Sequence, residues 1–216
     1  MALSTYTSLK DAIRRWSKRL DATDAFLDDF IDLCEEKIYA NEIEPLRIKE
    51  MDTRSTATVS TVTRFLELPD DFVQMRRLKI NAQTTTVPGP CRDTDVRYAA
   101  PDQIILSDQT GQPSFFTATS QLGFERIPDR AYTIEMQFWA KETALSDANT
   151  TNAVLTNYPS IYMMGSLWAL WDYYSEPQIS TDYYNKFLGA IKGANKVEKS
   201  GRYGPTPQIR SERFRP

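Results

Sequence analysis

The sequence predicts an α+β fold, mainly α, in which a bundle of about four helices carries an antiparallel β-rich insertion and ends in an extended C-terminal arm. Residues 1–45 and 155–200 place apolar residues at the three- and four-residue spacing of amphipathic helices. Residues 46–154 change to short alternating runs rich in β-branched residues, separated by Pro and Gly. Residues 201–216 have no period and are rich in Gly, Pro and Arg, which favours extended backbone.

The most apolar run of the chain, Tyr158–Tyr174, predicts a central helix. Pro159 suits the first turn, because its missing N–H costs nothing there. Apolar residues occur on every side of this helix, so other elements must cover several of its sides. The run is shorter than the roughly 20 apolar residues of a membrane span and contains Asp172, so we expect a core helix of a soluble domain and no membrane partner. Its remaining aromatic side lies against either the β-rich insertion or a neighbouring subunit: Tyr162, Trp168 or Tyr173.

Three more helices are expected to pack on this one. Ser8 is predicted to cap the first helix. The second helix is expected from about Thr23 to Glu42, and another helix is expected to start near Ser180. The inward stripes of the three are expected to be Leu9, Ile13, Trp16 and Leu20; Phe26, Leu27, Phe30, Leu33, Cys34 and Ile38; and Tyr183, Phe187, Ala190, Ile191 and Ala194.

Two glycines of the last helix, Gly189 and Gly193, lie one turn apart. Each costs about 1 kcal/mol relative to Ala in a helix. A neighbour that approaches the backbone closely would offset this cost; the alternative is two tolerated glycines on a partly exposed helix.

Strands are expected at residues 46–49, 56–63, 65–68, 75–80, 114–119, 123–127 and 131–140. In the last of these, Tyr132, Ile134, Met136 and Phe138 share one face, because side chains alternate along a strand. A loop at residues 145–156 then leads back to the helices.

Composition excludes several classes of chemistry. The chain has no His, which removes His-based acid–base catalysis and most zinc sites. A net charge of −3 argues against binding nucleic acid by neutralising phosphates. Cys34 and Cys91 have no motif around them, and Cys34 is expected to be a small buried hydrophobic residue. We therefore assign no catalytic, cofactor-binding or metal-binding residue and expect no enzyme activity.

Four acidic residues spaced four apart mark one face of the second helix: Asp24, Asp28, Asp32 and Glu36. Like charges at this spacing are mildly destabilising. The stripe is either an ordinary solvated face or a deliberately acidic surface.

The C-terminal arm combines arginines with apolar residues that suit an extended docking peptide: Arg202, Tyr203, Ile209, Arg210, Arg213, Phe214 and Arg215. Arg and aromatic residues are enriched in interface hot spots. We favour a partner-binding arm over a frayed terminus.

The order of these parts resembles the head-to-tail adaptor, or head completion, proteins of tailed bacteriophages, especially short-tailed ones. The blocks that carry the resemblance are Tyr6–Trp16, Asp28–Ile38, Leu68–Leu78, Tyr132–Asp147 and Asn152–Leu167. The order and spacing of these blocks are together fairly specific, and the blocks cover most of the chain.

The resemblance implies a virion protein at the neck between capsid and tail, made in the host cytoplasm. Such adaptors are helical bundles with a β-rich insertion that form a ring on the portal, usually of about twelve copies. They extend the DNA channel, without sequence-specific binding, and hold the next tail or nozzle protein, and tail fibres could be further partners. Extended C-terminal segments in such rings dock on the portal or a neighbouring subunit. The resemblance thus assigns residues 201–216 to docking, and the acidic stripe then suits the channel or its rim, since negative walls repel phosphates.

Two other classes compete with this interpretation. A tail-side stopper or terminator ring protein is expected to be dominated by its sheet. A cell-wall hydrolase would have to use carboxylates, for which the candidates are Glu67, Asp70 and Asp71.

Overall fold

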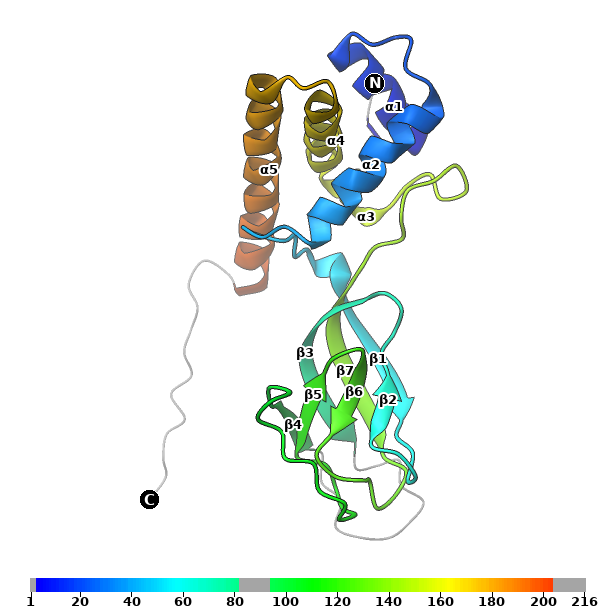
Figure 1. Ribbon diagram of the computed structural model, residues 1–216, viewed down its shortest axis with the longest axis vertical. Helices are drawn as coiled ribbons and strands as arrows, with labels where there is room; N and C mark the ends of the chain where they lie inside the picture. The colour runs from blue at the N-terminus through cyan, green and yellow to red at the C-terminus, as the bar shows by residue number, and fades with distance from the viewer. Residues whose placement is uncertain (1–2, 82–93, 204–216) are drawn as a thin grey trace. The chain divides into compact units, whose positions relative to one another are not determined.

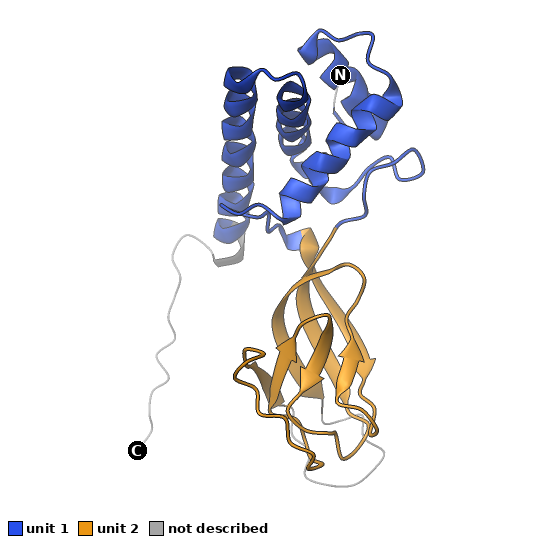
Figure 2. Ribbon diagram, viewed as in Figure 1, with its two compact units in different colours: residues 1–49, 142–216 blue, residues 50–141 orange. Residues whose placement is uncertain are grey.

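The computed structural model describes residues 3–81 and 94–203 of the 216-residue chain. In that part, five α-helices and seven strands divide between two compact units (Figures 1 and 2). Unit 1 comprises residues 1–49 and 142–216, and unit 2 comprises residues 50–141. The elements of unit 1 are α1 (Tyr6–Ser17), α2 (Asp24–Tyr39), α3 (Ala153–Asn157), α4 (Pro159–Tyr173) and α5 (Pro177–Tyr203).

The predicted fold class is wrong. Unit 1 is not a four-helix bundle, because the expected loop before α4 contains α3, which Asn152 caps by accepting a hydrogen bond from the Leu155 N–H. The sheet of unit 2 is mixed rather than antiparallel, since β4 (Thr94–Tyr98) and β5 (Phe115–Ala118) run parallel.

Helix α4 is the centre of unit 1, as predicted. Helices α1, α2, α3 and α5 all contact it, and Pro159 begins it. Ile161, Tyr162, Leu167 and Leu170 are fully buried, and burial of each such side chain stabilises the fold by about 1.5–3 kcal/mol. The other helices of unit 1 therefore cover most sides of α4, Tyr162 included, whereas Tyr173 at its C-terminal end is exposed.

Gly165 of α4 is the point of closest approach in unit 1. A methyl group at this position would overlap the Cys34 sulfur of α2 and lie 3.0 Å from the Phe187 ring of α5. Gly189 and Gly193 have no atom within 4 Å of the corresponding position, so the hypothesis of close approach at these two glycines is wrong. Cys34 is a buried small side chain, as expected.

Helix α1 begins earlier than predicted, because Thr5 rather than Ser8 is the cap. The Thr5 hydroxyl accepts a hydrogen bond from the Ser8 N–H, and the Ser8 hydroxyl accepts one from the Thr5 N–H. Leu9 and Ile13 are buried as predicted, whereas the expected inner residues Trp16 and Leu20 are 56% and 76% exposed.

The predicted strand at residues 46–49 is wrong. Leu46 and Ile48 are buried, but the Leu46 N–H bonds to the Ile38 carbonyl and the Arg47 N–H to the Asn195 side chain. The alternating pattern thus arises from packing on helices α2 and α5. A 3-10 turn, Lys49–Met51, follows.

Unit 2 is a seven-stranded sheet in the order β1-β7-β3-β4-β5-β6-β2. The remaining strands are β1 (Asp52–Thr58), β2 (Phe65–Glu67), β3 (Phe72–Asn81), β6 (Gln121–Phe124) and β7 (Thr133–Ala140). Ile134, Met136 and Phe138 are buried on one face of β7, and Tyr132 just before it is also buried, as predicted. They form one core with residues of the other strands: Leu78, Ile80, Val96, Phe116, Leu122 and Phe124.

Gly165→Ala should destabilise the protein by about 1–3 kcal/mol, because the added methyl group overpacks the contact of α4 with α2 and α5. The exposed Gly189→Ala should instead stabilise it by about 0.5–1 kcal/mol, because the substitution only removes backbone freedom from the unfolded chain. Urea unfolding followed by circular dichroism measures both. Equal effects of the two substitutions would contradict the packing described for Gly165.

Candidate functional site

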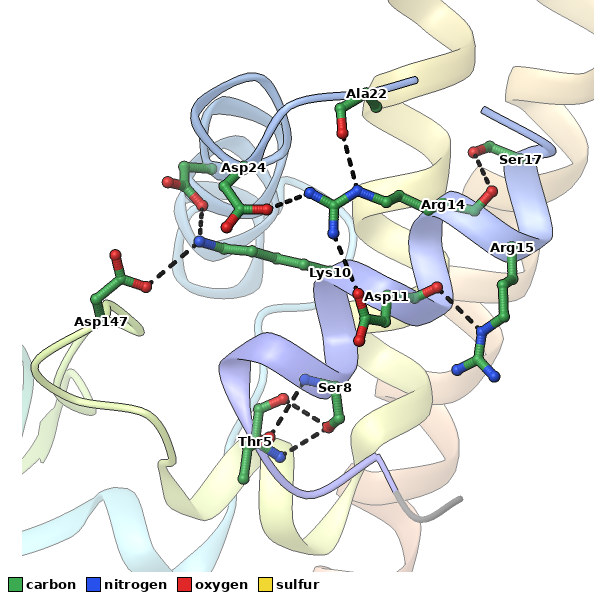
Figure 3. Close-up of polar contacts among 11 residues, drawn as sticks. Thr5, Ser8, Lys10, Asp11, Arg14, Arg15, Ser17, Ala22, Asp24 and Asp147 are labelled. Atoms are coloured by element: carbon green, nitrogen blue, oxygen red, sulfur yellow. Dashed lines mark hydrogen bonds and ion pairs between the residues drawn. The ribbon is translucent and has the colours of Figure 1, made fainter. Parts of the chain in front are cut away.

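The acidic stripe of α2 faces two different environments. Asp28 lies against α1: the Tyr6 hydroxyl donates to its carboxylate at 2.6 Å, and the Lys10 ammonium lies 2.6 Å from the same oxygen. Arg14 pairs with Asp24 (Figure 3). Within the described residues, Asp32 and Glu36 are exposed and have no ion pair. The four carboxylates therefore do not form one surface.

Lys10 is the buried member of this cluster, with only 2% of its surface exposed. Its ammonium lies 4.0 Å from the centre of the Tyr6 ring. It also lies 3.5 Å from Asp147 (Figure 3). Burial alone would lower the pKa of Lys10, but the hydrogen bond and the charge of Asp28 outweigh it and raise the pKa. The cluster thus holds α1 on α2 through a buried, charge-assisted contact.

The exposed part of the stripe is strongly negative. Partial burial, together with the charges of Asp28 and Asp29, raises the pKa of Asp32. The hydrogen bond from Arg14 lowers the pKa of Asp24. Asp24 and Asp28 are thus matched by cations of α1, while Asp29, Asp32 and Glu36 leave negative charge at the surface.

A second polar network lies inside unit 1, around Glu35. Its carboxylate accepts hydrogen bonds from the Tyr162 hydroxyl at 2.8 Å and from the Leu145 N–H at 2.9 Å. Asn152 donates to the Tyr162 oxygen at 2.7 Å. Burial raises the pKa of Glu35, despite these donors. The network ties α2 to α4 and to the segment before α3.

Aromatic rings gather where α2 begins and α4 ends. The Phe26 and Phe30 rings are 4.8 Å apart, and Phe26 lies 5.3 Å from Tyr173. The Arg19 guanidinium lies 4.4 Å from the centre of the Tyr174 ring. Because Tyr173 is 63% exposed, this cluster presents aromatic surface of the kind that is enriched in protein interfaces.

A groove of about 280 Å³ lies on unit 1, lined by Lys37, Asn41, Glu42, Ile43, Trp168 and Tyr184. The helices α2, α4 and α5, with the segment after α2, supply these residues. No motif in the sequence predicts this groove, because its residues come from three separate parts of the chain.

Unit 2 has two larger grooves that share Tyr98. One, of about 560 Å³, lies along β3, where β4 pairs only with residues 78–80. The other, of about 520 Å³, includes Ile105 and Phe115, which are 85% and 41% exposed. Unit 2 therefore also presents an apolar surface suited to a protein partner.

The first residues of the predicted C-terminal arm are helical. Helix α5 continues to Tyr203, so Arg202 and Tyr203 belong to its last turn and the prediction of an extended segment from residue 201 is wrong there. The other predicted docking residues, Ile209, Arg210, Arg213, Phe214 and Arg215, lie outside the described residues.

The candidate catalytic carboxylates are all on the surface. Glu67 ends β2, and Asp70 and Asp71 lie in the turn before β3, all exposed to solvent. None of them has the apolar surroundings that tune a carboxyl group to act as a general acid.

A family model described as SU10 adaptor protein matches residues 4–210. This match covers nearly the whole chain, so the chain belongs to the SU10 adaptor family. It is a structural head–tail adaptor protein of a bacteriophage virion. The family match confirms the predicted class, a phage head–tail adaptor. No curated protein matched the chain. None of the helices in residues 3–81 and 94–203 has the length and apolar character that a membrane crossing requires.

Asp28→Asn should lower the free energy of unfolding by about 3 kcal/mol, because it leaves the buried Lys10 ammonium with only the exposed Asp147 carboxylate, 3.5 Å away, as a charged partner. The matched change at the exposed Asp24, Asp24→Asn, should cost less than about 1 kcal/mol. Urea unfolding at neutral pH measures both. Equal losses would show that burial of Lys10 does not set the strength of the cluster.

Glu35→Gln should change how stability depends on pH. A carboxyl group whose folded pKa is raised favours the folded state below its unfolded pKa, and that contribution is lost as pH rises through the folded pKa. The variant should therefore gain stability relative to the wild type between acidic and neutral pH. Urea unfolding at several pH values measures this difference, and a difference that stays constant with pH would contradict the burial of an ionisable Glu35.

Proposed function

We propose that the chain assembles into a closed, cyclic ring of about twelve copies on the portal of a phage. In this proposal the ring extends the DNA channel and forms the platform for the next tail or nozzle protein. The observation that carries it is the family match over residues 4–210.

The character of unit 1 supports a role in permanent assembly. Its core is complete around α4, so one copy can fold before it meets its neighbours. Its surface nevertheless keeps large apolar side chains exposed, among them Trp16, Leu20, Tyr173 and Val197. Exposed aromatic and apolar residues of this kind suit interfaces between subunits.

Charge supports the proposed channel. The net charge of −3 lets DNA pass without being held, because a basic wall would bind phosphates. Asp24 and Asp28 are already matched by cations of α1, so the repulsion of DNA in this proposal comes from the chain as a whole and not from the four-residue stripe.

The C-terminal residues 204–216 are the proposed docking segment. They carry Arg210, Arg213 and Arg215 against a single Glu, with Ile209 and Phe214 among them. Arg and aromatic residues are the commonest hot spots of interfaces. A deletion that starts at residue 204 leaves α5 intact, because that helix ends at Tyr203.

Electron microscopy of the purified chain mixed with its portal tests this function. The full chain should add a ring to the portal, whereas a chain that lacks residues 204–216 should add none and keep its circular dichroism spectrum. Rings that form equally well without residues 204–216 would rule out these residues as the docking segment, and the proposed function itself fails if the full chain adds no density to the portal.

A further inference from the structure

Helix α2 carries an acidic face, formed by Asp29, Asp32, Leu33 and Glu36. All four residues are exposed, and their spacing of three and four residues places them on one side of the helix. No basic residue occurs among residues 24–36. Leu33 is 47% exposed and gives this face an apolar centre.

Helix α5 carries a basic face, formed by Lys186, Gly189, Lys192, Gly193 and Lys196. All five residues are exposed and follow one another at helical spacing, so they share one side of the helix. No acidic residue occurs among residues 183–197. Lys192 and Lys196 have no ion pair within the described part of the chain. The two helices therefore present opposite charges to solvent.

The two glycines form an open slot in the middle of the basic face. A methyl group at Gly189 or Gly193 would have no atom of its own copy within 4 Å. Glycine destabilises a helix but lets another backbone approach closely. The distance between two packed helices depends on the side chains at their contact, so this slot admits a helix with one protruding apolar residue.

The spacing of the charges matches between the two faces. At about 1.5 Å per residue, Leu33 lies about 6 Å along α2 from Asp29 and about 4.5 Å from Glu36. The middle of the glycine slot lies about 7.5 Å along α5 from both Lys186 and Lys196. With Leu33 over the slot, each carboxylate is therefore offset from a lysine by only about 1.5–3 Å along the axis, which a flexible lysine side chain covers.

The acidic and basic faces cannot meet within one copy. Helix α4 contacts both α2 and α5 (Figure 1). Cys34 of α2 and Phe187 of α5, which are both buried, lie against Gly165 of α4. The exposed faces are on the other sides of α2 and α5, directed away from α4. Their opposite charges can therefore pair only between two copies.

A cation from another copy relieves repulsion on the acidic face. Partial burial and the charges of Asp28 and Asp29 raise the pKa of Asp32. Among the described residues, neither Asp32 nor Glu36 has an ion pair. A lysine beside these carboxylates therefore adds an attraction that the single copy lacks.

We infer that the acidic face of α2 in one copy packs on the basic face of α5 in the next copy, with Leu33 over Gly189 and Gly193. This inference rests on the proposed ring and names the surfaces through which its copies meet. Because two different surfaces meet, the contact is head-to-tail, the arrangement that forms a ring when it closes.

Sedimentation velocity of the full chain at low salt tests the inference. The wild type should associate increasingly up to about 1 mM, because one helix pair is a small interface, and added salt should weaken the association. Asp32→Lys with Glu36→Lys should abolish association, and so should Lys192→Glu with Lys196→Glu, because each variant places like charges face to face. An equimolar mixture of the two variants should associate again, because each contact then joins faces of opposite charge.

Two further variants separate this contact from general effects of charge and stability. Glu67→Lys with Asp70→Lys makes the same change of charge on exposed residues of unit 2 and should leave association unchanged. Gly189→Ala should weaken association although it stabilises the single copy, because its methyl group occupies the slot. Circular dichroism of every variant confirms that the fold is intact.

The inference is overturned if the wild type stays monomeric, if either charge variant associates as the wild type does, or if their mixture does not recover association. It is also overturned if Lys192→Glu with Lys196→Glu keeps association and loses binding to a short DNA duplex, because the basic face then contacts nucleic acid. The assay contains no portal. A ring on the portal that both charge variants still form sinks only this interface, whereas association without a ring on the portal sinks only the proposed function.

Discussion

The close packing of α4 against α2 and α5 at Gly165 is the constraint on which unit 1 depends. Only a residue without a side chain lets the Cys34 sulfur and the Phe187 ring approach this helix from two sides. That approach places the apolar residues of α4 out of water and brings Tyr162 within reach of Glu35 and Asn152. The polar network is therefore a consequence of how closely the three helices pack.

The same packing determines which surfaces remain for partners. Since α4 is covered within one copy, self-association does not have to complete the core. The charged residues divide in a similar way, because α1 neutralises Asp24 and Asp28 and leaves Asp32 and Glu36 exposed. The groove that includes Asn41, Trp168 and Tyr184 lies near the C-terminal end of α2.

Long periodic segments were predictable from the sequence, and contacts between distant segments were not. The apolar run of α4 and the alternation in β7 each identify a buried element, because their pattern reports burial directly. The alternation of Leu46 and Ile48 led to the wrong prediction of a strand, because loop residues that pack on helices can show the same pattern. The spacing of Gly189 and Gly193 suggested close packing, but that depends on the neighbour, which only the fold supplies. The partners of Asp28 come from another helix, and so do the walls of the groove.

A cryo-electron microscopy map of the assembled ring tests the account most directly. It should show a closed ring in which α4 is covered within each subunit around Gly165. A map in which α4 is covered only by a neighbouring subunit would contradict the account.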